Sequence, residues 1–335
     1  MVKKITIKDI LKTIHSDLIG KDSHRGITLT YGWMANQVGH FALGYIPATL
    51  LHFFTRLELL HSVIYVCSIW LLFEIYNTLS PLYKKEYKGN GTFHVRWLNL
   101  AFDTFTDLCF FWFGAFSFYY VVSESNPYFY FYFAGQAVLL VFIRYWFLTK
   151  LFQQNAFFPY QFRLSQWGAP INESSANEIK SFLYKNSGRK HFLIFGQKGS
   201  GKTRLSVGIG NEFSIEHKLS TYTTFTKWLT FLAEDNPTSL SSKISLWSWF
   251  ESDILLIDDI HPGIPLNANR FKANDVFEFV TRVNKDRNLQ ALRGMSVAWV
   301  VGTCHPDEGI KDWRNLLINL GIPESEIVIV DLDKV

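Results

Sequence analysis

Four long apolar stretches occupy the first half of the chain, with few charges inside them. A transmembrane helix needs about 20 predominantly apolar residues, because the hydrocarbon core of a bilayer is about 30 Å thick. Helices of soluble proteins normally keep a polar face, which these stretches lack. The pattern predicts an α-helical membrane domain at 36–150, with four transmembrane helices at about 38–54, 57–79, 98–122 and 128–148.

The polar N-terminal segment, 1–35, contains one amphipathic stripe. Its apolar positions recur at helical spacing, at Ile7, Ile10, Leu11, Ile14 and Leu18. Thr6 and Asp9 form a capping-box pattern at the start of the predicted helix, and Lys8 and Lys12 lie off the stripe. Two interpretations stay open: a basic amphipathic helix on the anionic inner leaflet of the membrane, or a helix that packs on the soluble domain.

Lysine and arginine are concentrated in the N-terminal segment and in the connection between the second and third apolar stretches. These residues are Lys3, Lys4, Lys8, Lys12, Lys21, Arg25, Lys84, Lys85, Lys88 and Arg96. The other connections contain only Arg56 beside Glu58, and Glu124 with no basic residue. Cytoplasmic loops carry an excess of Lys and Arg. We therefore expect a multi-pass protein of the inner membrane with both termini cytoplasmic and no cleavable signal peptide.

Ionisable residues inside the apolar stretches lie near the expected cytoplasmic ends. They are Glu74, Asp103, Asp107 and Arg144. Asp103 and Asp107 are four residues apart and share a helix face. Charges within a membrane are costly and usually paired. We expect either a pair between Arg144 and Asp107 or Glu74, or side chains that reach the lipid headgroups.

After residue 150 the pattern becomes that of a soluble α/β protein. Short apolar runs alternate with helical stretches, and the runs predicted as strands are 191–195, 219–225, 254–257, 297–301 and 327–330. This alternation is typical of a parallel sheet covered by helices on both faces. We expect a three-layer αβα domain with a five-stranded parallel sheet at 191–335, preceded by a linker at 151–190.

The first predicted strand runs directly into Gly196-Gln-Lys-Gly-Ser-Gly-Lys-Thr203, which fits the P-loop (Walker A) pattern G-x-x-x-x-G-K-[ST]. Its glycines let backbone N–H groups face phosphates at a helix N-terminus. The residues expected to bind the nucleotide are Gly196, Gln197, Lys198, Gly199, Ser200, Gly201, Lys202, Thr203 and Arg204. Lys202 is expected to reach the β- and γ-phosphates of ATP, and Thr203 to bind Mg²⁺.

The apolar run 254–257 ends in two carboxylates, Asp258 and Asp259, as in a Walker B motif. We expect Asp258 to hold Mg²⁺ through water and Asp259 to act as the general base on the attacking water. Thr303 follows the fourth predicted strand and is either a polar sensor of the γ-phosphate or a simple turn residue.

Composition narrows the remaining function classes. Apolar residues make up 48% of the chain and the formal net charge is +4, which excludes a disordered chain. Cys67, Cys109 and Cys304 are far apart and odd in number, so neither a disulfide framework nor a zinc site is supported.

The soluble half resembles a known group of proteins. FLIFGQKGSGKTRLSVGIGNEF, followed by TYTTFTKWL and DILLIDDIH, looks like the AAA+ ATPases of the DnaA, DnaC and IstB type. In that group the P-loop is followed by a T-H-L…A-I-x-N-E pattern. The matching positions here are Thr203, Leu205, Ile209, Asn211 and Glu212, whereas Arg204 replaces the usual His. The resemblance covers about half the chain, from residue 157 onward.

The resemblance implies MgATP hydrolysis in a homo-oligomer. It also implies that 158–179 approaches the adenine pocket. Arg314 is expected either to act as an arginine finger on the ATP of a neighbouring subunit or to be an ordinary solvated helix arginine. We expect a departure from the group, namely that the helical lid domain and the DNA-binding helix-turn-helix are absent.

Together these features predict a membrane-anchored ATPase. We expect MgATP hydrolysis that is slow or depends on a partner. We expect this hydrolysis to be coupled to oligomer assembly or to a change in the membrane or in an unidentified partner protein. One alternative is a membrane-anchored signalling or scaffold module that binds ATP and barely hydrolyses it. Another is a membrane-tethered ATPase that handles nucleic acid. The main cations between the second and third predicted strands are Lys227 and Lys243, which are few for binding a phosphate backbone. A gated channel or transporter is disfavoured by the sparse charge inside the apolar stretches.

Overall fold

The computed structural model describes residues 6–18, 29–83, 92–123, 134, 144–145, 147–185, 188–233, 246–260, 272–302 and 309–333. These residues belong to two compact units. The helical unit consists of Thr6–Tyr87 and Arg96–Leu151, and the α/β unit contains Lys88–Val95 and Phe152–Val335.

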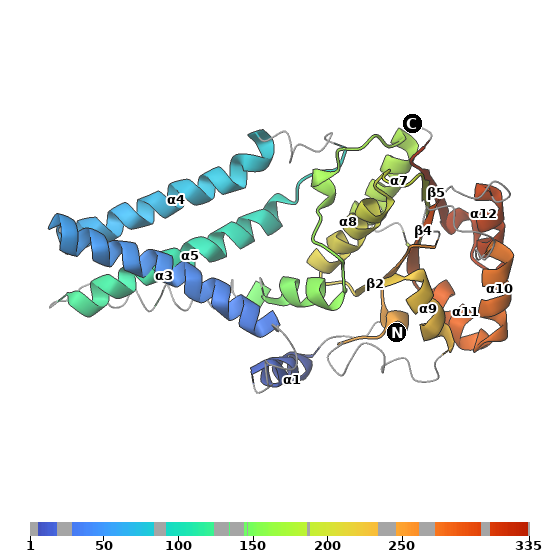
Figure 1. Cartoon of the computed structure of the whole chain (residues 1–335), viewed down its shortest axis with the longest axis horizontal. Coiled ribbons are helices and arrows are strands. Elements are labelled where there is room, and N and C mark those ends of the chain that lie inside the picture. Colours follow the sequence, from blue (N-terminus) through green and yellow to red (C-terminus); the bar gives the residue numbers. More distant parts are fainter. Residues whose placement is uncertain are drawn as a thin grey trace. The chain divides into compact units, whose positions relative to one another are not determined.

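The helices of the helical unit whose bounds are defined are labelled in Figure 1. They are α1 (Ile7–Leu18), α3 (Leu29–Thr55), α4 (Leu59–Tyr83) and α5 (Trp97–Val122). The expected capping box of α1 is present, because the backbone N of Thr6 donates to Asp9 Oδ2 at 2.9 Å and the backbone N of Asp9 donates to Thr6 Oγ1 at 3.3 Å.

Two of the described helices could cross a membrane, judged by length and composition alone. They contain the windows Leu59–Leu79 and Trp97–Val122, of which only 28% and 39% are buried within the structure. Helix α3 covers the first expected span but is not among them, since it carries glycines, histidines and Pro47. The expected span at 128–148 lies almost entirely outside the described residues. Of the four transmembrane helices predicted, two therefore have a candidate by length and composition in the described part of the chain.

Helices α3 and α5 approach backbone to backbone at a pair of glycines. A Cβ atom added to Gly44 would overlap the carbonyl oxygen of Phe111, and one added to Gly114 would overlap that of Phe41. Small residues at such crossings allow close packing of helices. Gly39, on the same helix as Gly44, has nothing within 4 Å of its added Cβ.

Polar side chains tie the three long helices together. Trp70 Nε1 on α4 donates to the carbonyl of Leu43 at 2.8 Å, and Trp112 Nε1 on α5 donates to that of Cys67 at 3.1 Å. Hydrogen bonds across helices are a common way of joining helices in membranes.

The ionisable residues of this unit are arranged differently from the expected pairs. Asp107 Oδ1 lies 3.1 Å from Nδ1 of His40 on α3, and Glu74 is buried. Arg144 is exposed. The close polar contact that the structure records for Asp107 is therefore with His40, a residue that a count of Lys, Arg, Asp and Glu does not include.

We expect Gly44→Ala to lower the free energy of unfolding by about 2–3 kcal/mol, because the added methyl group meets backbone that cannot yield. Gly39→Ala is the matched control and is expected to be neutral or slightly stabilising, since alanine is the better helix former. Thermal unfolding of the full-length protein in detergent measures both. Equal midpoints for the two variants would contradict the close crossing of α3 and α5.

The α/β unit is built on a five-stranded parallel sheet, as predicted. Its strands are β1 (His191–Gly196), β2 (Ser220–Thr224), β3 (Ile254–Asp258), β4 (Ser296–Gly302) and β5 (Ile327–Asp331). Their order in the sheet is β2-β3-β4-β1-β5, and every recorded pairing is parallel.

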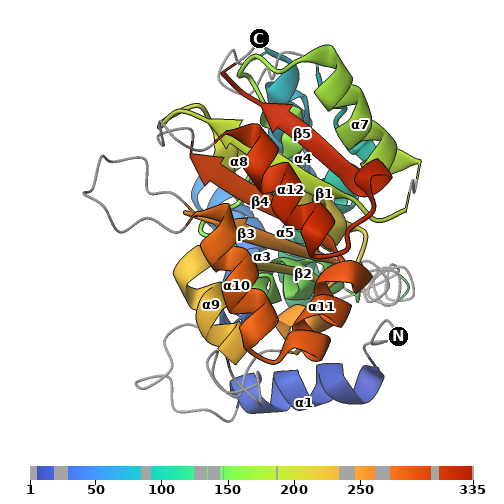
Figure 2. The same cartoon turned by 90° about the vertical axis from the view of Figure 1, so that its right-hand side faces the viewer.

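Helices cover both faces of this sheet, so the three-layer αβα prediction is confirmed. Figure 2 shows α9 (Phe225–Ala233), α10 (Ala273–Arg282), α11 (Lys285–Gly294) and α12 (Ile310–Asn319) in front of the strands. The other face carries α7 (Glu173–Tyr184) and α8 (Lys202–Ile215). Short 3₁₀ turns lie at η1 (Leu164–Gln166), η2 (Trp249–Glu251) and η3 (Glu324–Glu326).

Alternate strand residues face the two helical layers. Leu193 of β1 belongs to the core on the α9–α12 face, whereas Phe192 and Ile194 belong to the core on the α7–α8 face. Phe93 is 3% exposed and is part of the α7–α8 core. The described segment 92–95 therefore belongs to the α/β unit, although the sequence placed it inside the membrane domain at 36–150.

Strand β1 is the point where the direction of the sheet reverses. The chain leaves β1 along α8 toward the β2 edge, and it then returns through β3 and β4 to β5 by helices on the opposite face. Right-handed crossovers require this change of face. Ligands of open α/β sheets bind beyond the carboxyl ends of the strands at such a reversal, which is where the P-loop begins.

Candidate functional site

The P-loop bends sharply between β1 and α8. Gly196 is the last residue of β1, and Lys202 is the first residue of α8. Gly199 and Gly201 have φ angles of 86° and 93°, a left-handed conformation that favours glycine. The loop therefore wraps around the N-terminus of a 14-residue helix, where free N–H groups and the helix dipole favour anions.

Two side chains of the P-loop have notable surroundings. Nζ of Lys202 donates to the carbonyls of Gly196 and Gln197, both at 2.6 Å. Oγ of Ser200 is buried and has no hydrogen-bond partner among the described residues. A buried hydroxyl without a partner is costly, so this oxygen marks a place where a ligand would satisfy it.

Asp258 is the last residue of β3, and Asp259 follows it, at the same carboxyl-terminal end of the sheet as the P-loop. The end of β4 lies between these residues and β1. Neighbouring strands are about 4.8 Å apart, so β1 and β3 are separated by about 10 Å. Asp258 is 2% exposed, and its Oδ1 accepts from the backbone N of Asp259 at 2.8 Å.

Asp259 is exposed and has a φ angle of 56°, an uncommon value outside glycine that Asp tolerates better than most residues. Partial burial of its carboxylate and the neighbouring carboxylate of Asp258 raise its pKa, and Lys202 acts in the opposite direction. The charges of Lys202 and of both carboxylates therefore act on one another across the site. A raised pKa suits a general base, because it increases proton affinity.

A third group of polar side chains lies beside Asp258. Tyr222 on β2 donates its hydroxyl to Asp258 Oδ2 at 2.9 Å. Burial raises the pKa of Tyr160, and Arg204 lowers it through its charge and a side-chain hydrogen bond. The guanidinium of Arg204 also lies 5.4 Å from the ring centroid of Phe162. Arg204, expected among the nucleotide-binding residues, thus contacts the segment that precedes α7.

The C-terminal end of β5 supports the base of the P-loop. Asp333 Oδ1 accepts from the backbone N of Gln197 at 2.8 Å, and the backbone N of Leu332 donates to the carbonyl of Phe195 at 2.9 Å. Nothing in the sequence pattern links Asp333 to the P-loop, because parallel pairing of β5 with β1 creates the contact.

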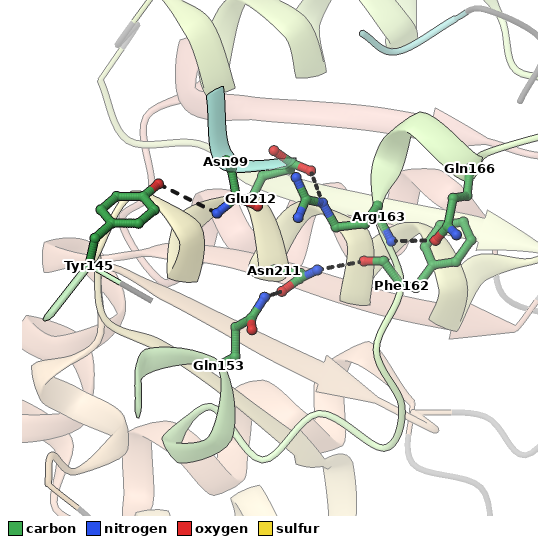
Figure 3. A network of polar contacts seen from close by, with 8 residues as sticks. All are labelled: Asn99, Tyr145, Gln153, Phe162, Arg163, Gln166, Asn211 and Glu212. Carbon is green, nitrogen blue, oxygen red and sulfur yellow. Dashed lines mark hydrogen bonds and ion pairs between the residues drawn. The ribbon is translucent and has the colours of Figure 1, made fainter. Parts of the chain in front are cut away.

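Residues 152–167, which we call the strap, are tied to the end of α8 by a polar network shown in Figure 3. Gln153 Nε2 donates to Asn211 Oδ1 at 2.8 Å, and Asn211 Nδ2 donates to the carbonyl of Phe162 at 2.9 Å. Arg163 Nε lies 3.7 Å from Glu212 Oε1. Asn211 and Glu212 are 1% and 2% exposed. Asn211 and Glu212, which match the sequence pattern that follows the P-loop in the AAA+ group that the chain resembles, therefore hold the strap in place.

Three glycines let the strap lie close to α8 along its length. Added Cβ atoms would lie 2.9 Å from Phe158 at Gly210, 2.7 Å from Leu164 at Gly208, and 2.9 Å from Trp167 at Gly201. The strap thus follows α8 from its C-terminal end to the P-loop. Its start also pairs with the sheet, because the backbone N of Tyr222 donates to the carbonyl of Ala156 at 2.7 Å.

Two further predicted residues lie apart from this cluster. Thr303 lies outside the described residues, although β4 ends at Gly302 as expected. Arg314 lies on α12, as predicted, and pairs with Glu324. Its side chain is 37% exposed, so the pair lies at the surface of the unit.

Sequence reasoning missed the residues that support the site from a distance in the chain, namely Tyr222, Asp333 and Trp167. Tyr222 lies in the quoted stretch TYTTFTKWL, but only the pairing of β2 with β3 brings it to Asp258. Among the described residues, no group of three or more His, Cys, Asp or Glu is placed to hold a metal ion. No protein family and no curated protein matches the chain.

We expect Asn211→Leu to lower the free energy of unfolding by about 2–3 kcal/mol, because the amide of Gln153 and the carbonyl of Phe162 would lose their partner in a buried place. Asn274→Leu on α10 is the control, since Asn274 is exposed and bonds only locally to Glu278 in the recorded hydrogen bonds. It is expected to stay within about 0.5 kcal/mol of the wild type. Chemical unfolding of the full-length protein measures both, and equal stabilities would contradict the role of Asn211.

Proposed function

We propose that this protein is a membrane-anchored ATPase, similar to the AAA+ group, that binds and hydrolyses MgATP at the P-loop of its α/β unit. The reaction would drive a change in oligomer assembly, in a partner protein or in the membrane. One observation carries the proposal. The P-loop, which bends at two left-handed glycines before the N-terminus of α8, lies at the same carboxyl-terminal end of the sheet as the buried carboxylate of Asp258.

The residues present fit a magnesium–nucleotide complex. A loop with two left-handed glycines directs N–H groups toward phosphate oxygens, and Ser200 offers a buried hydroxyl without a partner among the described residues. Mg²⁺ usually keeps several waters and binds through one or two protein oxygens plus phosphates. Thr203 and Asp258 suffice for such a site without a cluster of ligands.

The roles of the side chains follow from their chemistry. Bound MgATP would supply the transferable phosphoryl group. Lys202 provides positive charge at the P-loop, and Thr203 provides a hydroxyl at the start of α8. Asp258, which is buried, would accept a hydrogen bond from metal-bound water, and Asp259, exposed beside it, would accept a proton from the attacking water.

The membrane part of the proposal rests on α4 and α5. Their apolar windows are long enough to cross a bilayer, and most of each window is not buried within the structure, unlike a core helix of a soluble protein. On α1, Ile7 and Leu11 are 71% and 60% exposed, and Lys8 and Lys12 are exposed beside them. An amphipathic helix of this kind suits the anionic surface of the inner leaflet.

Coupling is supported by the path of the chain. The strap begins directly after the helical unit ends and then follows α8 to the P-loop. A conformational change at the P-loop would therefore act on the segment through which the chain enters the α/β unit. A homo-oligomer is proposed because Arg314 offers a partly exposed guanidinium that could complete the site of a neighbouring subunit.

Steady-state ATP hydrolysis by the full-length protein in detergent, over a range of protein concentrations, tests the proposed function. We expect the rate per protomer to rise with concentration. Lys202→Ala and Arg314→Ala should each lower it at least about a hundredfold, since each removes positive charge from the transferred phosphoryl group. Lys285→Ala and Arg282→Ala, which alter exposed residues of α11 and α10, are the matched controls and should retain the wild-type rate.

Several outcomes would overturn parts of this proposal. A wild-type rate no higher than that of Lys202→Ala at every concentration would favour an ATP-binding signalling or scaffold module. A rate independent of concentration and unaffected in Arg314→Ala would remove the arginine finger. Binding of single-stranded DNA that weakens steeply with salt would instead support a nucleic-acid-handling ATPase.

A further inference from the structure

Tyr222 touches the candidate metal-binding carboxylate directly, although it is 36 residues away in the chain. It lies on β2, the edge strand that pairs with β3. In the register of this pair, Tyr222 is opposite Leu256 and Thr224 is opposite Asp258. The tyrosine side chain is therefore long enough to reach two residues forward along β3, to the end of the strand.

The carboxylate of Asp258 is held by two donors of different origin. Oδ1 accepts from the backbone N of Asp259 at 2.8 Å, and Oδ2 accepts from the hydroxyl of Tyr222 at 2.9 Å. A carboxylate offers about four lone-pair sites, so each oxygen retains one for a further partner. The two donors fix the rotation of the carboxylate and thus the direction in which its remaining lone pairs point.

Replacement of the hydroxyl by water is disfavoured, because Asp258 is 2% exposed. A tyrosine hydroxyl keeps its proton at neutral pH, because the usual pKa of the phenol is about 10. Hydrogen bonds from a neutral donor to a charged acceptor are stronger than those between neutral groups. The hydroxyl of Tyr222 is therefore a steady donor to Asp258 at neutral pH.

We propose that Tyr222 is a positioning residue for magnesium: it orients Asp258 toward the water shell of the metal and so sets the Mg²⁺ requirement of the site. This inference rests on the proposed function, because it assigns a role within the same MgATP site. In this role Tyr222 acts through the carboxylate of Asp258, to which its hydroxyl donates, and not on the nucleotide itself.

Tyr222→Phe tests the role with little disturbance, since it keeps the ring that packs against the α7–α8 core and removes only the oxygen. Tyr184→Phe, on the exposed end of α7, is the matched control. For each full-length variant in detergent, the affinity for a fluorescent ATP analogue is measured in EDTA and at increasing Mg²⁺ concentrations. Steady-state hydrolysis is measured over the same Mg²⁺ range.

In both measurements we expect Tyr222→Phe to raise the Mg²⁺ concentration that gives the half-maximal response about tenfold. A change of this size corresponds to the loss of one charge-assisted hydrogen bond. Nucleotide affinity in EDTA should stay at the wild-type value, as should all values for Tyr184→Phe. Should Tyr222→Phe fail to fold, Tyr222→Met carries the same expectation, because it also fills apolar space but offers no hydroxyl to Asp258.

The outcomes separate this inference from the proposed function. Wild-type protein that shows no Mg²⁺-dependent nucleotide binding overturns both. Normal wild-type behaviour with an unchanged Mg²⁺ dependence in Tyr222→Phe overturns the inference alone. A loss of affinity that is equally large in EDTA and in Mg²⁺ also overturns it, since that result indicates a general structural role of the tyrosine.

Discussion

The α/β unit depends on the enclosure of α8 from Leu205 to its last residue, Ile215. Every residue from Leu205 to Ile215 is buried, because the sheet covers one side of this helix and the strap and α7 cover others. Gly208 and Gly210 make this enclosure possible, since larger residues would collide with the strap or with β3. The N-terminus of the helix, which carries the P-loop, is consequently held in place by packing of the residues that follow the first turn.

This enclosure connects the site with the rest of the chain. The strap contacts α8 at Asn211 and Glu212 near one end, and it contacts Gly201 just before the other end. A displacement at the P-loop is therefore transmitted along the helix to Asn211 and Glu212, the polar residues that hold the strap. From the opposite side of the site, β2 brings Tyr222 to Asp258, and β5 brings Asp333 to Gln197. The edge strands thus support both halves of the candidate site.

The local pattern of the sequence was sufficient to predict the strands, the P-loop and the start of α1, because their signals lie within a few consecutive residues. Hydropathy predicted α4 and α5 equally well. It could not predict the crossing of α3 and α5 at Gly44 and Gly114, the pairing of His40 with Asp107, or the contact of Tyr222 with Asp258. Each of these joins elements far apart in the chain, and their partners are set by strand order and helix packing.

Amide hydrogen exchange of the full-length protein, with and without a slowly hydrolysed ATP analogue and Mg²⁺, tests most directly whether the P-loop holds a nucleotide. The account predicts slower exchange in residues 196–205, where N–H groups of the loop and of the first turn of α8 would bind phosphate. This protection should require both the analogue and an intact Lys202. Unchanged exchange at 196–205 under saturating analogue and Mg²⁺ would contradict the central claim.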